Sequence, residues 1–195
     1  MNFSYRISRA GLRVLYGGLC RWDVNGVENV PETGGLIVVA NHVSLNDPPV
    51  LGAALPRKIN YMAKKELFDN FFLDKLLKKF GAFPVKRGRG DMGAIKKALK
   101  TVRQEKVLGL FPEGTRSQTG KLKRAKSGIV LIATKAQVPI LPVGLKGTKK
   151  PFRKDLEVNF GEAFTLDEYY NRKLDKKELK AAGKIIMEQI EKQLK

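Results

Sequence analysis

Residues 36–55 read LIVVANHVSLNDPPVLGAAL, and this stretch decides the fold. Five apolar and mostly β-branched residues at 36–40 predict a buried strand. A polar loop follows, and a helix is expected over residues 47–55, because Pro48 and Pro49 are tolerated in a helix's first turn. A strand that leads through a short polar loop into a helix is typical of a layered α/β protein.

The alternation of strands and helices continues along the chain. Apolar runs predict further strands over residues 59–63, 82–85, 107–111 and 140–145, and residues 156–160 are expected to form an edge strand. Helical periodicity predicts helices over residues 72–80, 92–102, 127–136 and 176–195. Within residues 72–80, one helix face carries Leu73, Leu76, Leu77 and Phe80. We therefore expect an α/β fold with a largely parallel or mixed central sheet flanked by helices.

Length and composition set limits on the class of protein. A chain of 195 residues with 43% hydrophobic content fits one compact domain with a short appendage. Cys20 is the only cysteine, so an internal disulfide is excluded and the cysteine spacings of zinc sites are absent. A reducing, cytoplasmic setting follows from the same observation. We identify no secretory signal and no apolar run of about 18 residues that would span a bilayer.

The first 25 residues are expected to form a separate basic amphipathic segment, followed by the main domain at 26–195. Residues 1–20 predict a helix on which Arg6, Arg9 and Arg13 recur at helical spacing. The apolar residues of this helix are Phe3, Ile7, Ala10 and Val14 on another face, widened by Leu12, Leu15, Tyr16 and Leu19. Such a helix suits a membrane interface, but it can equally pack on the core of its own domain.

The net charge of +19 is extreme and unevenly distributed. Residues 114–154 contain eleven Lys or Arg and no acidic residue. A field of this kind attracts polyanions such as nucleic acid, an anionic membrane or an acidic carrier protein. Composition alone does not choose among these partners, and general solubility is a further explanation.

His42 is the only histidine of the chain, and it lies in the loop that follows the first predicted strand. Imidazole is the side chain best suited to act as a general base near neutral pH. Asp47 lies five residues further on, so a tight turn can bring its carboxylate against one ring nitrogen and fix the tautomer. The alternative is an isolated histidine near an unrelated aspartate. Ser44 can support the loop by hydrogen bonding.

Polar clusters follow three of the predicted strands, at residues 41–47, 86–90 and 112–117. The carboxyl ends of parallel strands meet at one edge of a sheet, which is where such sheets bind ligands. Arginine's planar fork matches phosphate oxygens, so the clusters indicate a phosphorylated ligand. Residues 88–93 match G-x-G-x-x-G, but their place in mid-chain and their basic neighbours argue against a dinucleotide site. The chain lacks a G-x-S-x-G elbow, and Ser44 lacks a second histidine to serve it, so the sequence disfavours a serine hydrolase.

Four sequence blocks resemble the glycerolipid acyltransferases, and most closely the bacterial 1-acyl-sn-glycerol-3-phosphate (lysophosphatidate) acyltransferases. The blocks are NHVSLND at 41–47, FPVKR at 83–87, FPEGTRS at 111–117 and VPILPV at 138–143, in the order expected for the family. The pairing of H-x-x-x-x-D with F-P-E-G-T-R-S is highly specific. One departure is AKSG at 125–128, where many relatives carry an aromatic residue before the lysine. This departure leaves the shape of the acceptor pocket open.

The resemblance assigns roles to particular residues. It implies that His42 takes the proton from the acceptor hydroxyl and that Asp47 holds His42 in place, with Asn41 and Ser44 in support. It implies that Arg87 and Arg116 bind the substrate phosphate, with Lys126 as a weaker candidate, while Glu113 and Gly114 shape that loop. The strand that carries Pro139 and Pro142 is implied to shape the acyl site.

The resemblance also implies the reaction and the partners. Residues 26–195 become an acyltransferase domain that moves a fatty acyl group from acyl carrier protein or coenzyme A to the sn-2 hydroxyl of lysophosphatidate. A thioester is already activated, so neither a metal nor a cofactor is expected. The basic N-terminal segment is expected to bind an anionic phospholipid membrane at the cytoplasmic face of the inner membrane. Nucleic acid is the rival partner, disfavoured by the lack of a recognisable binding motif. Glycerol 3-phosphate and other lysophospholipids remain open as acceptors.

Overall fold

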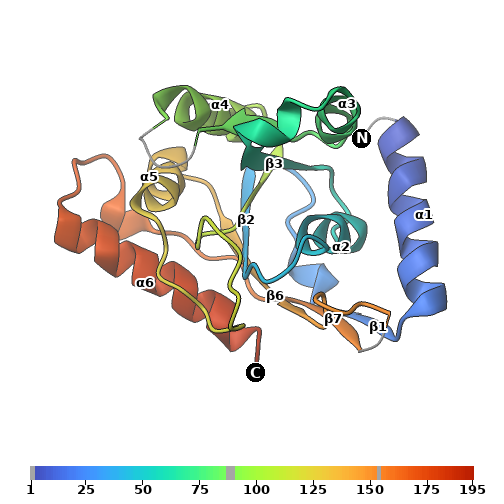
Figure 1. Cartoon of the computed structure of the whole chain (residues 1–195). Coiled ribbons are helices and arrows are strands. Elements are labelled where there is room, and N and C mark those ends of the chain that lie inside the picture. The colour runs from blue at the N-terminus through green and yellow to red at the C-terminus, as the bar shows by residue number, and fades with distance from the viewer. Residues whose placement is uncertain (1–2, 87–90, 153–154) are drawn as a thin grey trace.

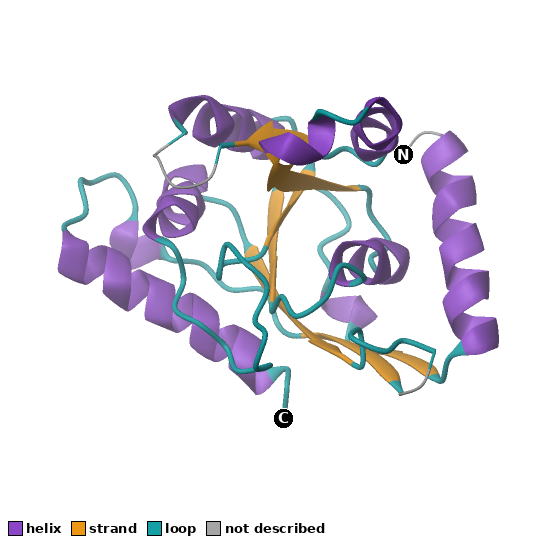
Figure 2. Ribbon diagram, viewed as in Figure 1, coloured by secondary structure: helices purple, strands orange, loops and turns teal. Residues whose placement is uncertain are grey.

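The computed structural model describes residues 3–86, 91–152 and 155–195, and these residues form a sheet with helices on both of its faces (Figures 1 and 2). The helices are α1 (Phe3–Leu19), α2 (Asp47–Ala54), α3 (Phe71–Lys79), α4 (Met92–Arg103), α5 (Ser127–Ala136) and α6 (Lys176–Lys192). The strands are β1 (Trp22–Asn25), β2 (Leu36–Ala40), β3 (Ile59–Lys64), β4 (Phe83–Val85), β5 (Val107–Leu110), β6 (Ile140–Lys146) and β7 (Leu156–Phe160). Short 3-10 helices are η1 (Val27–Asn29), η2 (Lys65–Phe68) and η3 (Asp167–Tyr169). The α/β class expected from the sequence is confirmed.

The sheet is mixed, with the strand order β1-β7-β6-β2-β5-β3-β4. The run from β6 through β2, β5 and β3 to β4 is parallel, whereas β7 is antiparallel to β6 and β1 is parallel to β7. The prediction of an edge strand at residues 156–160 is wrong, because β1 pairs with β7 and covers that edge. The pattern of only four residues, Trp-Asp-Val-Asn, was too short to predict β1 from periodicity. Residues 22–25, assigned above to the N-terminal segment, therefore belong to the main sheet.

Strand β2 lies at the centre of the sheet, and all five of its residues are buried. Successive side chains of a strand point to opposite faces, so β2 contributes to two cores. Leu36, Val38 and Ala40 pack with the side of the sheet covered by α2, while Ile37 and Val39 pack with the side covered by α4, α5 and α6. The burial of both faces explains why residues 36–40 carry no polar side chain.

Helix α1 lies outside α2 and uses two of its faces (Figure 1). Tyr5, Leu12 and Tyr16 point inward, and the two tyrosines are buried. A second set of bulky apolar residues on α1 is exposed to solvent: Phe3, Ile7, Val14, Leu15 and Leu19. The helix expected at residues 1–20 thus packs on its own domain through one face and leaves an apolar face free. Within the described ranges, no helix has both the length and the apolar content needed to cross a bilayer.

Helix α3 also differs from the expectation for an ordinary amphipathic helix. Leu77 packs against the core and Phe80 follows the last residue of the helix, with its ring 6.2 Å from that of Tyr5. Leu73 and Leu76, which share the predicted apolar face, remain exposed. Asn70 caps the helix by accepting hydrogen bonds from the N–H groups of the first turn.

Candidate active site

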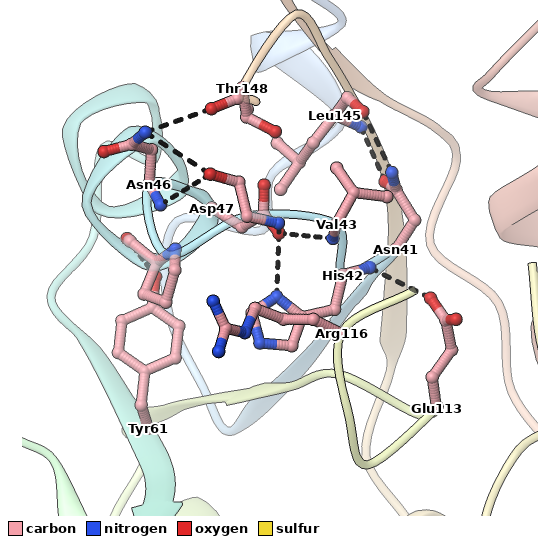
Figure 3. Close-up of polar contacts among 12 residues, drawn as sticks. Asn41, His42, Val43, Asn46, Asp47, Tyr61, Glu113, Arg116, Leu145 and Thr148 are labelled. Atoms are coloured by element: carbon pink, nitrogen blue, oxygen red, sulfur yellow. Dashed lines mark hydrogen bonds and ion pairs between the residues drawn. The ribbon is translucent and has the colours of Figure 1, made fainter. Parts of the chain in front are cut away.

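His42 and Asp47 form a close pair at the carboxyl end of β2 (Figure 3). The Nδ1 atom of His42 lies 2.7 Å from Oδ2 of Asp47. The Asp47 side chain is fully buried, whereas the His42 side chain keeps 12% of its surface exposed. The pairing expected from the five-residue spacing is therefore present, with the imidazole at the surface and the carboxylate beneath it.

The turn between the two residues is organised by one carboxylate oxygen. Oδ2 of Asp47 accepts the backbone N–H groups of Val43 and Ser44, each at 2.7 Å, in addition to the ring nitrogen of His42. A carboxylate at this position is an acceptor, so Nδ1 carries the proton and donates it. The other ring nitrogen, Nε2, then keeps its lone pair free. An imidazole in this tautomer is ready to take a proton from a bound hydroxyl.

The backbone of His42 is held on both sides by the segment that follows β5. The N–H of His42 donates to Oε1 of Glu113 at 3.0 Å, and its carbonyl accepts the N–H of Ser117 at 2.7 Å. The second oxygen of Glu113 accepts the N–H of Lys123 at 3.2 Å. Glu113 is 1% exposed. We expected Glu113 to shape a phosphate loop, and the structure gives it a direct contact with the backbone of His42.

Asn41 and Ser44 support the same loop from its two ends. The amide of Asn41 donates to the carbonyl of Leu145 at 2.9 Å and accepts the N–H of Leu145 at 2.8 Å. The side chain thus continues the pairing of β2 with β6 by one step beyond the strand. The hydroxyl of Ser44 accepts the backbone N–H of Asn46, whose side chain reaches the carbonyl of Thr148. Both side chains thus bond to backbone groups in and around the loop that carries His42, and their role in supporting catalysis stays a prediction.

A stack of three rings lies under the site. The ring of Phe111 stacks on His42 with 4.2 Å between centroids, and Tyr61 stacks on Phe111 at 6.1 Å. The hydroxyl of Tyr61 donates to the carbonyl of Pro48 at 2.8 Å, and burial raises the pKa of Tyr61 well above its ordinary value. A Cβ at Gly109 would lie 2.6 Å from the Tyr61 ring. Glycine in β5 therefore makes room for the ring that supports the stack.

Two of the basic residues expected to bind phosphate, Arg116 and Lys126, lie between β5 and α5. Arg116 is exposed, and in Figure 3 its side chain extends to the side of the site where the His42 ring lies. Gly114 has a φ of 72°, a conformation that favours glycine, and a Cβ there would lie 3.0 Å from the Lys126 side chain. The N–H of Lys126 donates to the carbonyl of Pro112. Arg87, the other expected phosphate ligand, lies outside the described residues.

The acyltransferase family profile matches residues 21–146, which include β1 to β6 and every residue of the pair and its supporting loop. The chain belongs to this acyltransferase family. A Bacillus subtilis 1-acyl-sn-glycerol-3-phosphate acyltransferase is 37% identical over 158 residues, which cover 77% of this chain and 76% of the relative. The relatives of the same name from Streptococcus pneumoniae and Borreliella burgdorferi are 31% and 33% identical. They are matched over 60% and 56% of their own length.

A solved structure shows the same fold. The crystal structure of the 1-acyl-sn-glycerophosphate (LPA) acyltransferase PlsC from Thermotoga maritima superposes with a TM-score of 0.75. The superposition covers 96% of this chain and 78% of that chain, at 23% sequence identity. The mixed seven-stranded sheet with flanking helices is therefore shared with that protein.

Pro139 and Pro142 occupy different places in this acyltransferase. Pro142 is buried within β6, where it pairs with Val39 of β2. Pro139 precedes β6 and is exposed at the amino end of the strand, on the edge of the sheet opposite to His42. The structure thus brings neither ring to the edge that carries the His42–Asp47 pair, and an acyl-shaping role for this strand stays a prediction.

Sequence reasoning missed several contacts of the acyltransferase site. Phe111 and Ser117 were quoted only as parts of the FPEGTRS block, although one stacks on His42 and the other bonds its carbonyl. Tyr61 and Thr148 were not singled out at all, because their contacts with the site join residues far apart in the chain. A signal for Phe111 was present in its position directly after β5, at the edge where the other clusters lie.

Proposed function

We propose that this acyltransferase moves a fatty acyl group from an acyl thioester to the sn-2 hydroxyl of lysophosphatidate and so forms phosphatidate. The observation that carries the proposal is the His42–Asp47 pair, with Nδ1 committed to the carboxylate and Nε2 free. The names of the relatives indicate the acceptor, and the guanidinium of Arg116, on the segment that holds the His42 backbone, suits its phosphate. His42 thus suits the hydroxyl of this acceptor, and Arg116 suits its phosphate.

The chemistry needs one proton carrier. Nε2 of His42 takes the proton of the acceptor hydroxyl as its oxygen attacks the thioester carbon. The tetrahedral intermediate then collapses, the C–S bond breaks, and the leaving thiolate takes the proton back from the imidazolium. Asp47 stabilises the imidazolium between the two transfers. General base assistance of this kind contributes about 10²- to 10⁴-fold to the rate.

Binding of the substrate phosphate is assigned to Arg116 and Arg87, with Lys126 as a weaker third partner. Arg116 and Lys126 are exposed on the segment that also fixes the His42 backbone. Phosphate bound there would therefore hold the acceptor at a set distance from Nε2. Glu113 and Gly114 keep the loop in shape and do not themselves need to touch the phosphate.

The acyl donor is proposed to be acyl carrier protein or coenzyme A, with no further cofactor. Both donors carry phosphate near the thioester, and a carrier protein is in addition acidic. A net charge of +19, with no acidic residue from 114 to 154, attracts either one. The positive charge supports association with either donor and does not distinguish acyl carrier protein from coenzyme A.

A position on the cytoplasmic face of the inner membrane is proposed for the enzyme. The exposed apolar face of α1 is flanked by Arg6 and Arg13, as in helices that lie in a membrane interface. Each well-placed cation adds about 1 kcal/mol of attraction to an anionic leaflet. Binding of this kind is peripheral or monotopic.

The test is transfer from a labelled long-chain acyl thioester to lysophosphatidate in detergent micelles, with the wild type and His42→Ala compared. We expect activity in the wild type and a loss of at least about two orders of magnitude in the variant. A folded variant with near-normal activity would exclude His42 as the base. Activity only with glycerol 3-phosphate or another lysophospholipid would overturn the acceptor and keep the mechanism.

A further inference from the structure

Helix α3 exposes more apolar surface than a helix on the surface of a domain requires. None of its nine residues is buried by the rest of the described chain. The exposed fractions are 64% for Phe71, 80% for Phe72, 42% for Leu73 and 50% for Leu76. The rings of Phe71 and Phe72 lie 5.7 Å apart, and Leu76 lies one turn after both Phe72 and Leu73, so the four side chains form one contiguous patch.

A patch of this composition is costly in water. Burial of a Phe or Leu side chain is worth about 1.5–3 kcal/mol each, and monomeric proteins rarely leave several such side chains exposed together. Scattered apolar residues on a surface are ordinary, but adjacent phenylalanines at the start of one helix are not. The patch therefore indicates an apolar partner.

The charges beside the patch indicate which partner it is. Helix α3 carries Lys75, Lys78 and Lys79 against a single acidic residue, Asp74, with which Lys78 pairs at 2.7 Å. The ammonium of Lys75 lies 4.1 Å from the centroid of the Phe71 ring. Long cationic side chains next to aromatic rings place their charge at headgroup level while the rings enter the acyl region. This arrangement complements an anionic lipid surface.

The patch lies on the side of the molecule where the site opens. β3 ends at Lys64, η2 follows it, and Phe71 begins α3, so the first turn of α3 emerges from the carboxyl end of the sheet. His42 follows the carboxyl end of β2 at the same edge. Leu45, in the loop between His42 and Asp47, is 70% exposed. Bulky apolar groups are thus exposed both on α3 and on the loop that carries the base.

We propose that α3 is a second membrane contact, in which Phe71, Phe72, Leu73 and Leu76 insert into an anionic leaflet. This inference extends the membrane contact proposed for α1, which lies beside α3 (Figure 1). The ring of Phe80, the residue after α3, contacts the ring of Tyr5 on α1. Two contacts fix the orientation of a body on a surface better than one. The pair of helices would hold the His42 edge against the leaflet from which the lipid acceptor is taken.

The experiment measures flotation of the full chain with vesicles of phosphatidylglycerol and phosphatidylcholine. The double variant Phe71→Ser/Phe72→Ser removes the two most exposed rings of the patch. We expect its partition coefficient to fall about ten- to a hundredfold. Val27→Ser, which changes an exposed apolar residue on η1, is the matched control and should bind like the wild type. Unchanged binding of the double variant would overturn the proposal.

Three further measurements separate this proposal from the alternatives. Phe3→Ser/Ile7→Ser tests α1 alone, so loss of binding in that variant only would leave α1 as the sole contact. Turnover in detergent micelles should be unchanged in the α3 variant, because its rings are outside the catalytic pair. Sedimentation without lipid tests whether the patch instead binds a second copy of the chain. A wild-type dimer that the α3 variant converts to monomer would assign the patch to this interface and overturn membrane insertion.

Discussion

The imidazole of His42 lies on the ring of Phe111, with 4.2 Å between ring centroids and 24° between the planes. Asp47 fixes one ring nitrogen of His42 but leaves rotation about that hydrogen bond open. The Phe111 ring restricts this rotation by covering one face of the imidazole. The direction in which Nε2 points is therefore set by two contacts of different kinds, one polar and one aromatic.

Replacement of Phe111 by leucine should lower kcat by up to about tenfold with little change in KM. The reason is that an aromatic pair contributes about 0.5–1.5 kcal/mol beyond burial, and its loss frees the imidazole plane. Steady-state kinetics measure the effect. Tyr61→Phe is the control, because it keeps the stack and removes only the hydrogen bond to Pro48. An equal kcat loss in both variants would argue against a specific contact with His42.

Asp47→Asn should reduce kcat by about 10²- to 10⁴-fold while the chain stays folded. The amide lacks the negative charge that stabilises the imidazolium. Its oxygen can still accept the three donors that converge on Oδ2, while its NH₂ group takes the place of Oδ1, which is buried and has no hydrogen-bond partner among the described residues. Single-turnover acyl transfer measures the chemical step directly. Asn46→Ala changes the neighbouring residue, which contacts Ser44 and Thr148 but not the ring, and it should retain most of the activity.

Glu113→Gln should destabilise the protein by about 1–3 kcal/mol and lower its activity. Both carboxylate oxygens accept backbone N–H groups, from His42 and from Lys123, in a buried place. A glutamine offers one acceptor and turns a donor toward the second N–H. Urea unfolding measures the change, with the exposed Glu162→Gln as the control. A stable but inactive Glu113→Gln would instead assign the residue to substrate binding.

The stabilisation that Glu178 gives to the N-terminus of α6 should be lost at low pH. The N–H of Asp175, followed by the guanidinium of Arg172, lowers the pKa of Glu178 below its ordinary 4.5. Because the folded-state pKa is the lower one, the stabilisation is fully present above about pH 4.5 and is lost as the pH falls through the folded value. Thermal unfolding of Glu178→Gln and wild type should differ near neutral pH and converge as the pH falls through the lowered pKa of Glu178. A constant difference would contradict the assignment.

The sequence allowed good prediction of those elements whose pattern is local. Residues 36–40 and 127–136 form β2 and α5 with the predicted bounds, because a run of apolar residues or a helical stripe is complete within each segment. The approach of Asp47 to His42 was also predictable, since five residues separate the two. The strand at β7 was predicted, but its place inside the sheet was not predictable, because this place depends on pairing with β1, more than a hundred residues away.

The sequence identified the residues of the candidate site better than it predicted the contacts that these residues make. Glu113 was expected near a phosphate, but it bonds the backbone of His42, and nothing in its local sequence distinguishes the two roles. Leu73 and Leu76 were placed on an apolar helix face, and periodicity cannot tell whether such a face meets the core or another surface. Tertiary contacts decide both cases.

The short strand β1 has a consequence for how the reaction selects its hydroxyl. It joins the end of α1 to β7, and the ring of Trp22 at its start packs edge-on against Tyr16, 5.7 Å away. Helix α1 is thus joined directly to the sheet through β1 and held there by the contact between Trp22 and Tyr16. If α1 rests on a lipid surface, His42 is held at one height above that surface. The depth at which an acceptor oxygen lies in the leaflet would then set the regiochemistry of acylation, together with the intrinsic reactivity of that oxygen.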